Sequence, residues 1–366
     1  MRWHAVAIGL AAAVLYWLTG PLGTGFDVYV PLAGAILDGH LWIGPHPWME
    51  LVPTADPQRW LVPFPPAPVL TLLPIVAFIP DLAPNVMASI LGGANVALVY
   101  LLLRGWGCSL RTTLWLTAAF ALTVHWWVAG LAGTHHYAQV CGVFFSLGAL
   151  NLAVRKRWPL AAGLLLGLAA ASRLPMGLAA PALLVLYGWR PRREHLLLLA
   201  GVAVPALLLV TYNLARFGDP LQFGYGLIPY NGEPITNEPW YVEGVLSVNY
   251  IPRSLYWMLL AGYSTGTSGA SVTMTAPFLF WAIEARGRTA AILGLSVVLV
   301  LLPDLAHGAW GFAQFGYRFI LDAVPLLLLL IGGAYRVAPS VSLRLAILAS
   351  IAAYAVGMLI IWAGTR

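Results

Sequence analysis

Charge is scarce in this chain of 366 residues: Asp, Glu, Lys and Arg make up only 9%, whereas 60% of the residues are hydrophobic. The mean hydropathy is +0.83. A water-soluble globular domain carries roughly 25% charged residues. The composition therefore excludes a soluble globule and indicates an integral membrane protein with several spans.

Cysteine is almost absent, and two common hydrolase motifs are missing. The two cysteines, Cys108 and Cys141, predict neither a disulfide framework nor a thiolate metal site. The chain has no His-Glu-x-x-His and no Gly-x-Gly-Asp sequence, which disfavours an intramembrane hydrolase of either type. Because no polar stretch is long enough to fold alone, we expect 1–366 to form a single transmembrane domain without a soluble C-terminal domain.

Long apolar runs, by contrast, fill most of the chain. A transmembrane helix needs about 20 mostly apolar residues, so we expect an all-α fold with about eleven crossings. A further run at 67–79 contains Pro68 and Pro74 and predicts a re-entrant or interfacial helix. The expected crossings lie at 4–22, 85–103, 112–130, 137–154, 159–173, 175–189, 195–213, 268–285, 289–303, 319–335 and 343–363.

The basic residues indicate an orientation. Most of the 19 Lys and Arg residues fall in short loops on the side of the amino terminus, and most of the 13 acids fall on the opposite side. Because basic loops accumulate in the cytoplasm, we expect a plasma (inner) membrane protein with a cytoplasmic amino terminus. This asymmetry accounts for the net charge of +6, and no nucleic-acid partner is expected.

The loops expected on the outer face are long and rich in Trp, Tyr, Pro, Gly and acids. Long ordered loops usually carry function. We expect juxtamembrane helices in the first of them, 23–84, and the active site between this loop and the outer ends of the later helices; the second long loop is 214–267. The first loop gathers Asp27, Asp38, His40, His46, Glu50, Asp56 and Arg59.

Short segments along the chain carry a family pattern. The first loop contains Gly-Phe-Asp-Val-Tyr at 25–29 and Phe-Pro-Pro-Ala-Pro at 64–68, and a later segment, 314–325, contains Gly-Tyr-Arg. Together with 32–41, 163–173 and 212–220, they resemble GT-C-fold membrane glycosyltransferases that use polyprenyl-phosphate sugars. The similarity is to bacterial relatives of protein O-mannosyltransferases and of lipid A aminoarabinose transferases.

This resemblance implies a GT-C-like fold and transfer of a sugar from a polyprenyl-phosphate carrier to an acceptor on the outer face, usually with inversion at the anomeric carbon. The acceptor stays open as a glycan, a lipid or a protein. Asp27 matches the family's first-loop acid, a catalytic base or acceptor-orienting group. A carboxylate at the membrane boundary suits this role because it can accept a proton from an attacking hydroxyl. The alternative is that Asp27 only caps a juxtamembrane helix.

The leaving lipid phosphate requires a cation, and arginine binds phosphate bidentately while staying ionised. Arg318 ranks first, Arg59 second by analogy with the relatives, and Arg253 is the third candidate. Alternatively, each snorkels to lipid head groups or pairs with an acid. Asp322 follows Arg318 by four residues on one helical face, so we expect Arg318 to neutralise Asp322, itself a possible substrate contact.

The better-known relatives have a second acid in the next outer loop, where this chain has His135 and His136. Four roles stay open for this doublet: holding the lipid phosphate, relaying a proton, ligating a divalent cation with a first-loop acid, or forming a plain interfacial polar cluster. Beyond this possible divalent cation, no cofactor is expected; the lipid-linked sugar donor is a substrate. Asp38 and Tyr225 are further candidate substrate contacts, although interfacial tyrosines occur in any membrane protein.

Two other classes remain open. A lipid or small-solute transporter or flippase explains many spans, but it predicts ionisable or broken mid-membrane sites in paired halves. A non-catalytic membrane assembly protein is compatible with the missing second acid. Transfer of labelled sugar separates the enzyme from both.

Overall fold

The computed structural model describes residues 2–21, 27–47, 50–230, 233–263, 269–311 and 314–364, and this part of the chain is mostly helical. Gly25 and Phe26 of the first-loop motif lie outside it. The α-helices are α1 (Arg2–Thr19), α2 (Tyr29–Leu37), α3 (Ala67–Val76), α4 (Pro84–Gly105), α5 (Leu110–Ala121), α6 (Val124–Leu131), α7 (Thr134–Val154), α8 (Pro159–Ala170), α9 (Ala180–Tyr187), α10 (Arg193–Phe217), α11 (Ile251–Leu259), α12 (Val272–Thr275), α13 (Arg288–Leu305), α14 (Val324–Ala334) and α15 (Val341–Gly364).

Shorter elements fill the connections. Two antiparallel pairs of two-residue strands, which the sequence did not predict, lie in the two long loops. The strands are β1 (Val52–Pro53), β2 (Trp60–Leu61), β3 (Pro229–Tyr230) and β4 (Glu233–Pro234), and the 3₁₀ helices are η1 (Leu174–Ala179), η2 (Tyr225–Leu227), η3 (Ile235–Asn237), η4 (Pro239–Tyr241), η5 (Val248–Tyr250), η6 (Pro277–Glu284) and η7 (Arg318–Asp322).

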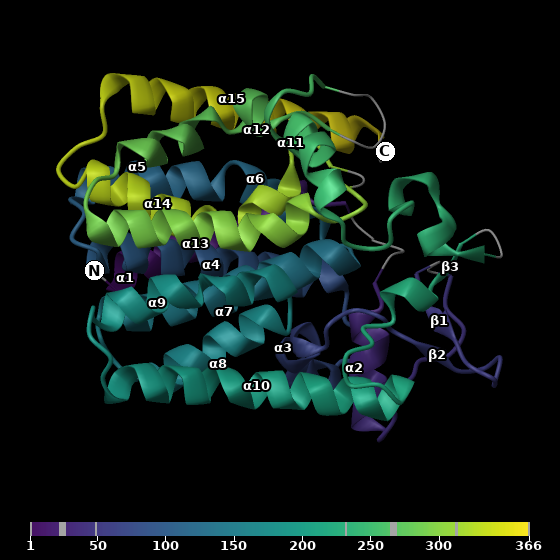
Figure 1. The fold of residues 1–366 in the computed structure, drawn as a ribbon. Coiled ribbons are helices and arrows are strands. Elements are labelled where there is room, and N and C mark those ends of the chain that lie inside the picture. The colour runs from purple at the N-terminus through teal and green to yellow at the C-terminus, as the bar shows by residue number, and fades with distance from the viewer. Residues whose placement is uncertain are drawn as a thin grey trace.

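The long helices lie side by side, and α2 and the strands gather at one end of the bundle (Figure 1). We call this the loop end; the amino terminus lies at the opposite end. In the described part of the chain, five helices are long and apolar enough to cross a membrane: α4, α7, α10, α13 and α15. The pair α5 and α6, bent by 44°, makes a sixth if it is counted as one span. The chain is therefore a multi-pass membrane protein.

The expectation of about eleven crossings is not supported. Several of the expected runs form shorter or broken helices: 175–189 becomes η1 and α9, 268–285 contains α12 and η6, and 319–335 contains η7 and α14. A proline stands in the first turn of η1, α9, η6 and α14. Proline cannot donate a backbone hydrogen bond and disfavours helix in the residue before it, so these runs divide at their prolines.

The first long loop carries α2 and α3, as expected of juxtamembrane helices. The run at 67–79 forms α3, which has ten residues and contains Pro74. Helix α3 packs on α2 and on α7. It is therefore a helix that is too short to cross a bilayer, and its re-entrant or interfacial position stays a prediction.

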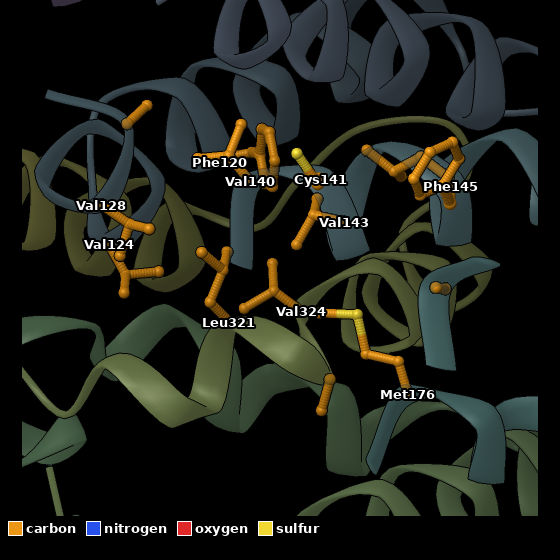
Figure 2. Packing of buried hydrophobic residues seen from close by; sticks show 14 of the residues in the cluster. Phe120, Val124, Val128, Val140, Cys141, Val143, Phe145, Met176, Leu321 and Val324 are labelled. Carbon is orange, nitrogen blue, oxygen red and sulfur yellow. The ribbon is translucent and has the colours of Figure 1, made fainter. Parts of the chain in front are cut away.

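The core is centred on α7. Of an apolar stretch of 18 residues in α7, 78% is buried, whereas only 22% of the corresponding stretch of α10, at the edge of the bundle, is buried. Figure 2 shows Val140 and Val143 of α7 facing Leu321, with Val324 and Met176 beside them. A helix that is apolar all round belongs inside a bundle, so the loop end of α7 is fixed by neighbours on several sides.

Helices α8 and α10 approach each other through glycine. A Cβ added to Gly163 would lie 2.0 Å from the carbonyl oxygen of Leu198, and one added to Gly201 would lie 2.2 Å from that of Leu160. Small residues allow this close approach of two helix backbones in a membrane. The two glycines therefore set the distance between α8 and α10.

Gly163→Ala is expected to lower the thermal unfolding temperature of the protein in detergent, because the added methyl group forces two backbones apart. Overpacking of this kind costs about 1–3 kcal/mol. The matched control is Gly294→Ala in α13, where a Cβ meets no atom within 4 Å; there, removal of a helical glycine is expected to be neutral or stabilising by about 0.5–1 kcal/mol. Equal unfolding temperatures for the two variants would contradict the packing argument.

Candidate functional site

A buried ion network joins several helices at the loop end. Arg173, which precedes η1, places Nε and Nη2 each 2.9 Å from Oδ2 of Asp322 at the end of η7. Its Nη2 also lies 3.1 Å from Oδ1 of Asp304 in the last turn of α13. Gln139 of α7 donates from Nε2 to Oδ1 of Asp322 at 2.9 Å. We call these four residues the Arg173 network.

The expected neutralisation of Asp322 by Arg318 is wrong, since Arg173 holds this carboxylate. Asp322 and Arg318 do stand four residues apart, but η7 is a 3₁₀ helix. With three residues per turn, the neighbour on one face is the third residue and not the fourth. The two side chains therefore diverge, and an arginine 149 residues away takes the place at Asp322.

Arg318 is buried, with 5% of its surface exposed. Its Nη1 lies 3.4 Å from Oε1 of Gln139, and its guanidinium carbon lies 4.9 Å from the centre of the Phe319 ring. Its buried Nε has no hydrogen-bond partner, and no carboxylate pairs with it, within the described residues. A buried charge without a direct ion-pair partner is costly, so the guanidinium is available to an anion.

The histidine doublet meets an acid of the first loop. Nε2 of His135 lies 2.7 Å from Oε2 of Glu50, and the Phe64 ring packs edge-on against His135 with the ring centres 4.8 Å apart. Burial raises the pKa of Glu50, but the His135 ring, together with Arg318 and His307, lowers it more, and the net pKa lies below its ordinary value. The Nε2 atom of His136 is buried without a hydrogen-bond partner in the described part of the chain.

The arrangement of these side chains gives little support to a metal site. The described residues contain no group of three or more His, Cys, Asp and Glu side chains that could hold a metal ion. The contact between Glu50 and His135 supplies two of the ligands that the sequence suggested. A proton relay or a phosphate contact needs no third ligand, so the geometry favours these roles for the doublet.

An aromatic cluster stands beside these charges. The hydroxyl groups of Tyr225 and Tyr241 lie 2.9 Å apart, and the His307 ring lies 5.7 Å and 5.6 Å from their ring centres. Nδ1 of His307 lies 3.1 Å from the Ala309 nitrogen, from whose N–H it can accept, and 2.9 Å from the Ala309 carbonyl oxygen, to which a protonated ring can donate. Burial lowers the pKa of His307 to about 4; the contact with the Ala309 carbonyl opposes this, and the Arg173 and Arg318 charges add to it. His307 is therefore neutral at pH 7.

Asp27 makes the contacts of a helix cap. Its Oδ1 accepts from the N–H of Tyr29 and its Oδ2 from the N–H of Val30, each at 3.0 Å. Burial raises the pKa of Asp27, and these two hydrogen bonds lower it less. The capping alternative is thus what the geometry shows, and the catalytic role stays a prediction. The Tyr29 ring lies 6.1 Å from that of Tyr137, so α2 rests near the start of α7.

The other predicted site residues make contacts of their own. Arg59 pairs with Asp56 at 2.9 Å on an exposed turn and stacks over the Trp42 ring. Arg253 donates to the carbonyl of Gly308 and stacks on Tyr250 and Trp310. Asp38 is exposed at the C-terminal end of α2. Their contacts with substrate stay predictions.

Sequence reasoning gave too little weight to Glu50 and Arg173 and did not select Asp304 or His307. One signal was available, since Arg173 and Asp304 are charges at the ends of apolar runs, where a charge is expensive and usually functional. Glu50 and His135 gave no such signal because 85 residues separate them.

No family model matches the chain, and neither a curated protein nor a solved structure matches it. Membership of the glycosyltransferase family therefore stays a prediction.

Arg173→Gln is expected to destabilise the protein by about 3–5 kcal/mol, because it leaves two buried carboxylates without an ion-pair partner. Arg318→Gln is the control: it removes a more deeply buried guanidinium that has no ion-pair partner in the described residues, so we expect a smaller loss of stability. Thermal unfolding of both variants in detergent checks this. A larger loss for Arg318→Gln than for Arg173→Gln would contradict the assignment of Asp322 to Arg173.

The free energy of unfolding is expected to fall as the pH drops from about 6.5 towards 4. His307 has a pKa of about 4 in the folded protein and about 6.5 when unfolded. As the pH falls, the unfolded state therefore binds the proton first. Proton binding in this window stabilises the unfolded state relative to the folded state by roughly 1–3 kcal/mol.

His307→Asn tests this dependence. Asn cannot titrate here, and its side chain can still accept from the N–H two residues later. Unfolding midpoints measured between pH 4 and 7 should therefore vary less in the variant than in the wild-type protein. Parallel curves would show that other groups carry the dependence.

Proposed function

We propose that the protein is a GT-C-type glycosyltransferase that moves a sugar from a polyprenyl-phosphate carrier to a glycan, lipid or protein acceptor. The observation that carries this proposal is the buried Arg318 guanidinium, which has no carboxylate partner in the described residues. Such a group stabilises a bound phosphate strongly because water does not screen it. The sequence resemblance supplies the type of reaction.

The donor suits a site at the end of a membrane bundle. A polyprenyl chain is apolar and stays in the bilayer, while its phosphate lies at the interface. The loop end joins apolar helices such as α7 and α13 to the side chains of the Arg173 network and to Arg318. A lipid phosphate must then enter between the helices and meet Arg318 without leaving the membrane.

The reaction requires one proton acceptor. An acceptor hydroxyl attacks the anomeric carbon, the bond from this carbon to the phosphate oxygen breaks, and its electron pair stays on the lipid phosphate. The hydroxyl proton passes to Asp27. Each carboxylate oxygen has a second lone pair beyond the one that caps α2, and the raised pKa of Asp27 favours proton acceptance.

Glu50 offers a second carboxylate in place of the acid that the relatives carry in the next outer loop. His135 lies against it at 2.7 Å, so the pair can pass a proton or orient the acceptor. The proposed contacts with the donor and the acceptor also include Arg59, Arg253, Asp38 and Tyr225.

The proposed orientation places the loop end on the outer face and the amino terminus in the cytoplasm. Arginines are frequent in the short connections opposite the loop end, for example at Arg155 and Arg190, as the positive-inside rule requires. Helices α8, α9 and α14 lie beside the longer helices in Figure 1. A GT-C-like bundle, in which such shorter helices also pass through the membrane, belongs to this proposal.

The test is transfer of labelled sugar from a polyprenyl-phosphate donor pool by the purified protein, with mass spectrometry of the lipid that copurifies. Asp27→Asn keeps the shape of the cap and is expected to lower kcat by about 10²- to 10⁴-fold. Arg318→Gln is expected to raise KM for the donor by roughly tenfold or more, since it removes a charged hydrogen bond worth about 1.5–3 kcal/mol.

Val242→Ala, at an exposed position of the second long loop, is the control and is expected to keep normal kinetics. Near-normal transfer by folded Asp27→Asn would remove the catalytic role of Asp27. Movement of lipid or solute across vesicle membranes without a covalent product would favour a transporter. Neither transfer nor transport would favour an assembly protein.

A further inference from the structure

A second polar site lies at the end of the bundle opposite the loop end. It is a cavity of about 280 Å³ where α4 and α14 end and α13 begins, and Trp106, Arg286, Arg288 and Arg336 contribute to its wall. Helix α13 has 18 residues and rises 1.5 Å per residue, so its two ends are about 27 Å apart. The cavity is therefore distinct from the Arg318 site.

The cavity has a cationic rim. Arg286, Arg288 and Arg336 are exposed, and none of them forms an ion pair within the described residues. Arg336 lies over the Trp106 ring, with its guanidinium carbon 5.4 Å from the ring centre. The acid nearest in sequence, Glu284, accepts a hydrogen bond from the Tyr335 hydroxyl. Positive charge therefore exceeds negative charge around the opening.

The first turn of α13 adds backbone donors to this rim. Arg288, Thr289 and Ala290 line the cavity, and this turn has neither an acidic residue nor a side-chain cap. The first N–H groups of a helix lack partners in the helix and favour an anion. They support the arginines but do not define the site alone.

The deeper wall is apolar. Leu293 lies about one turn into α13 and Leu330 about one turn before the end of α14, and both line the cavity. Because only 1% of Leu293 and 6% of Leu330 is exposed, the side towards the centre of the helices is a small apolar floor, while the side towards the connections is cationic. A free phosphate uses only the cationic side, whereas a phospholipid can also keep its acyl chains in the bilayer beside the helices.

From these observations we infer that the cavity binds the phosphodiester headgroup of an anionic phospholipid whose acyl chains stay in the surrounding bilayer. Basic pockets at the cytoplasmic ends of membrane helices bind such headgroups. The inference does not rest on the proposed glycosyl transfer, because lipid binding here needs neither a donor nor a reaction at Arg318.

The experiment is native mass spectrometry of the purified full-length protein in detergent, titrated with phosphatidylglycerol or with phosphatidylcholine of identical acyl chains. We expect saturable binding with a Kd for phosphatidylglycerol at least about tenfold lower. Replacing Arg286, Arg288 and Arg336 with Gln is expected to weaken this binding about fivefold for each arginine. Arg157, Arg190 and Arg193, also exposed arginines at this end, form the matched control triple, which should bind as the wild-type protein does.

Ala290→Phe separates the cavity from general charge attraction. It fills the cavity from α13 and keeps all three arginines, so the preference for phosphatidylglycerol is expected to disappear. Unfolding temperatures without added lipid verify that each variant is folded, and the wild-type comparison of the two lipids stands even where a variant fails to fold.

Four results would overturn the inference. These are equal wild-type affinity for the two lipids, equal losses in the two arginine triples, full binding by folded Ala290→Phe, and stabilisation of the protein by inorganic phosphate at concentrations where phosphatidylglycerol has no effect. The last result would assign the site to a free phosphate.

Discussion

The structure depends on the ion pairs that Arg173 forms with two carboxylates. Asp304 lies in the last turn of α13 and Asp322 ends η7, so one guanidinium fixes the loop end of α13 and the end of η7 relative to η1. Gln139 connects the same carboxylate to α7. With Arg318 nearby, two buried cations face two buried anions. The network is neutral as a whole, yet Arg318 forms no ion pair in the described residues, so an anion can bind there without breaking an existing salt bridge.

The broken helices and this network are parts of one arrangement. Irregular backbone at membrane depth is tolerated only where protein or a polar cavity surrounds it. Arg173 stands two residues before Pro175, where one expected crossing ends and the next begins, and Asp322 stands three residues before Pro325, within another. The charged groups thus lie beside prolines at irregular backbone, Arg173 just before the 3₁₀ helix η1 and Asp322 at the end of η7. A bundle of uninterrupted helices would not bring these side chains together.

The sequence allowed a correct prediction of long helices near 84–105 and 134–154, because about 20 apolar residues in succession have few alternatives. It also singled out Arg318, Asp322 and the histidine doublet. The pairing of Asp322 could not be predicted, since it depends on 3₁₀ geometry in η7 and on an arginine 149 residues away. The meeting of His135 with Glu50 likewise depends on how the first loop folds over α7, which local pattern does not encode.

The two ends of α13 place arginine in opposite electrostatic environments. Arg318 is buried, so its attraction for an anion is weakly screened, but ordering an anion there requires full loss of its hydration. Arg288 and Arg336 are exposed, so their attraction for an anion is weaker and sensitive to salt. The first environment suits one ligand held in a defined geometry, as a reacting phosphate must be. The second suits lipid headgroups that exchange with the bilayer, and a bundle that uses both can bind a reacting lipid at one membrane face and an anchoring lipid at the other.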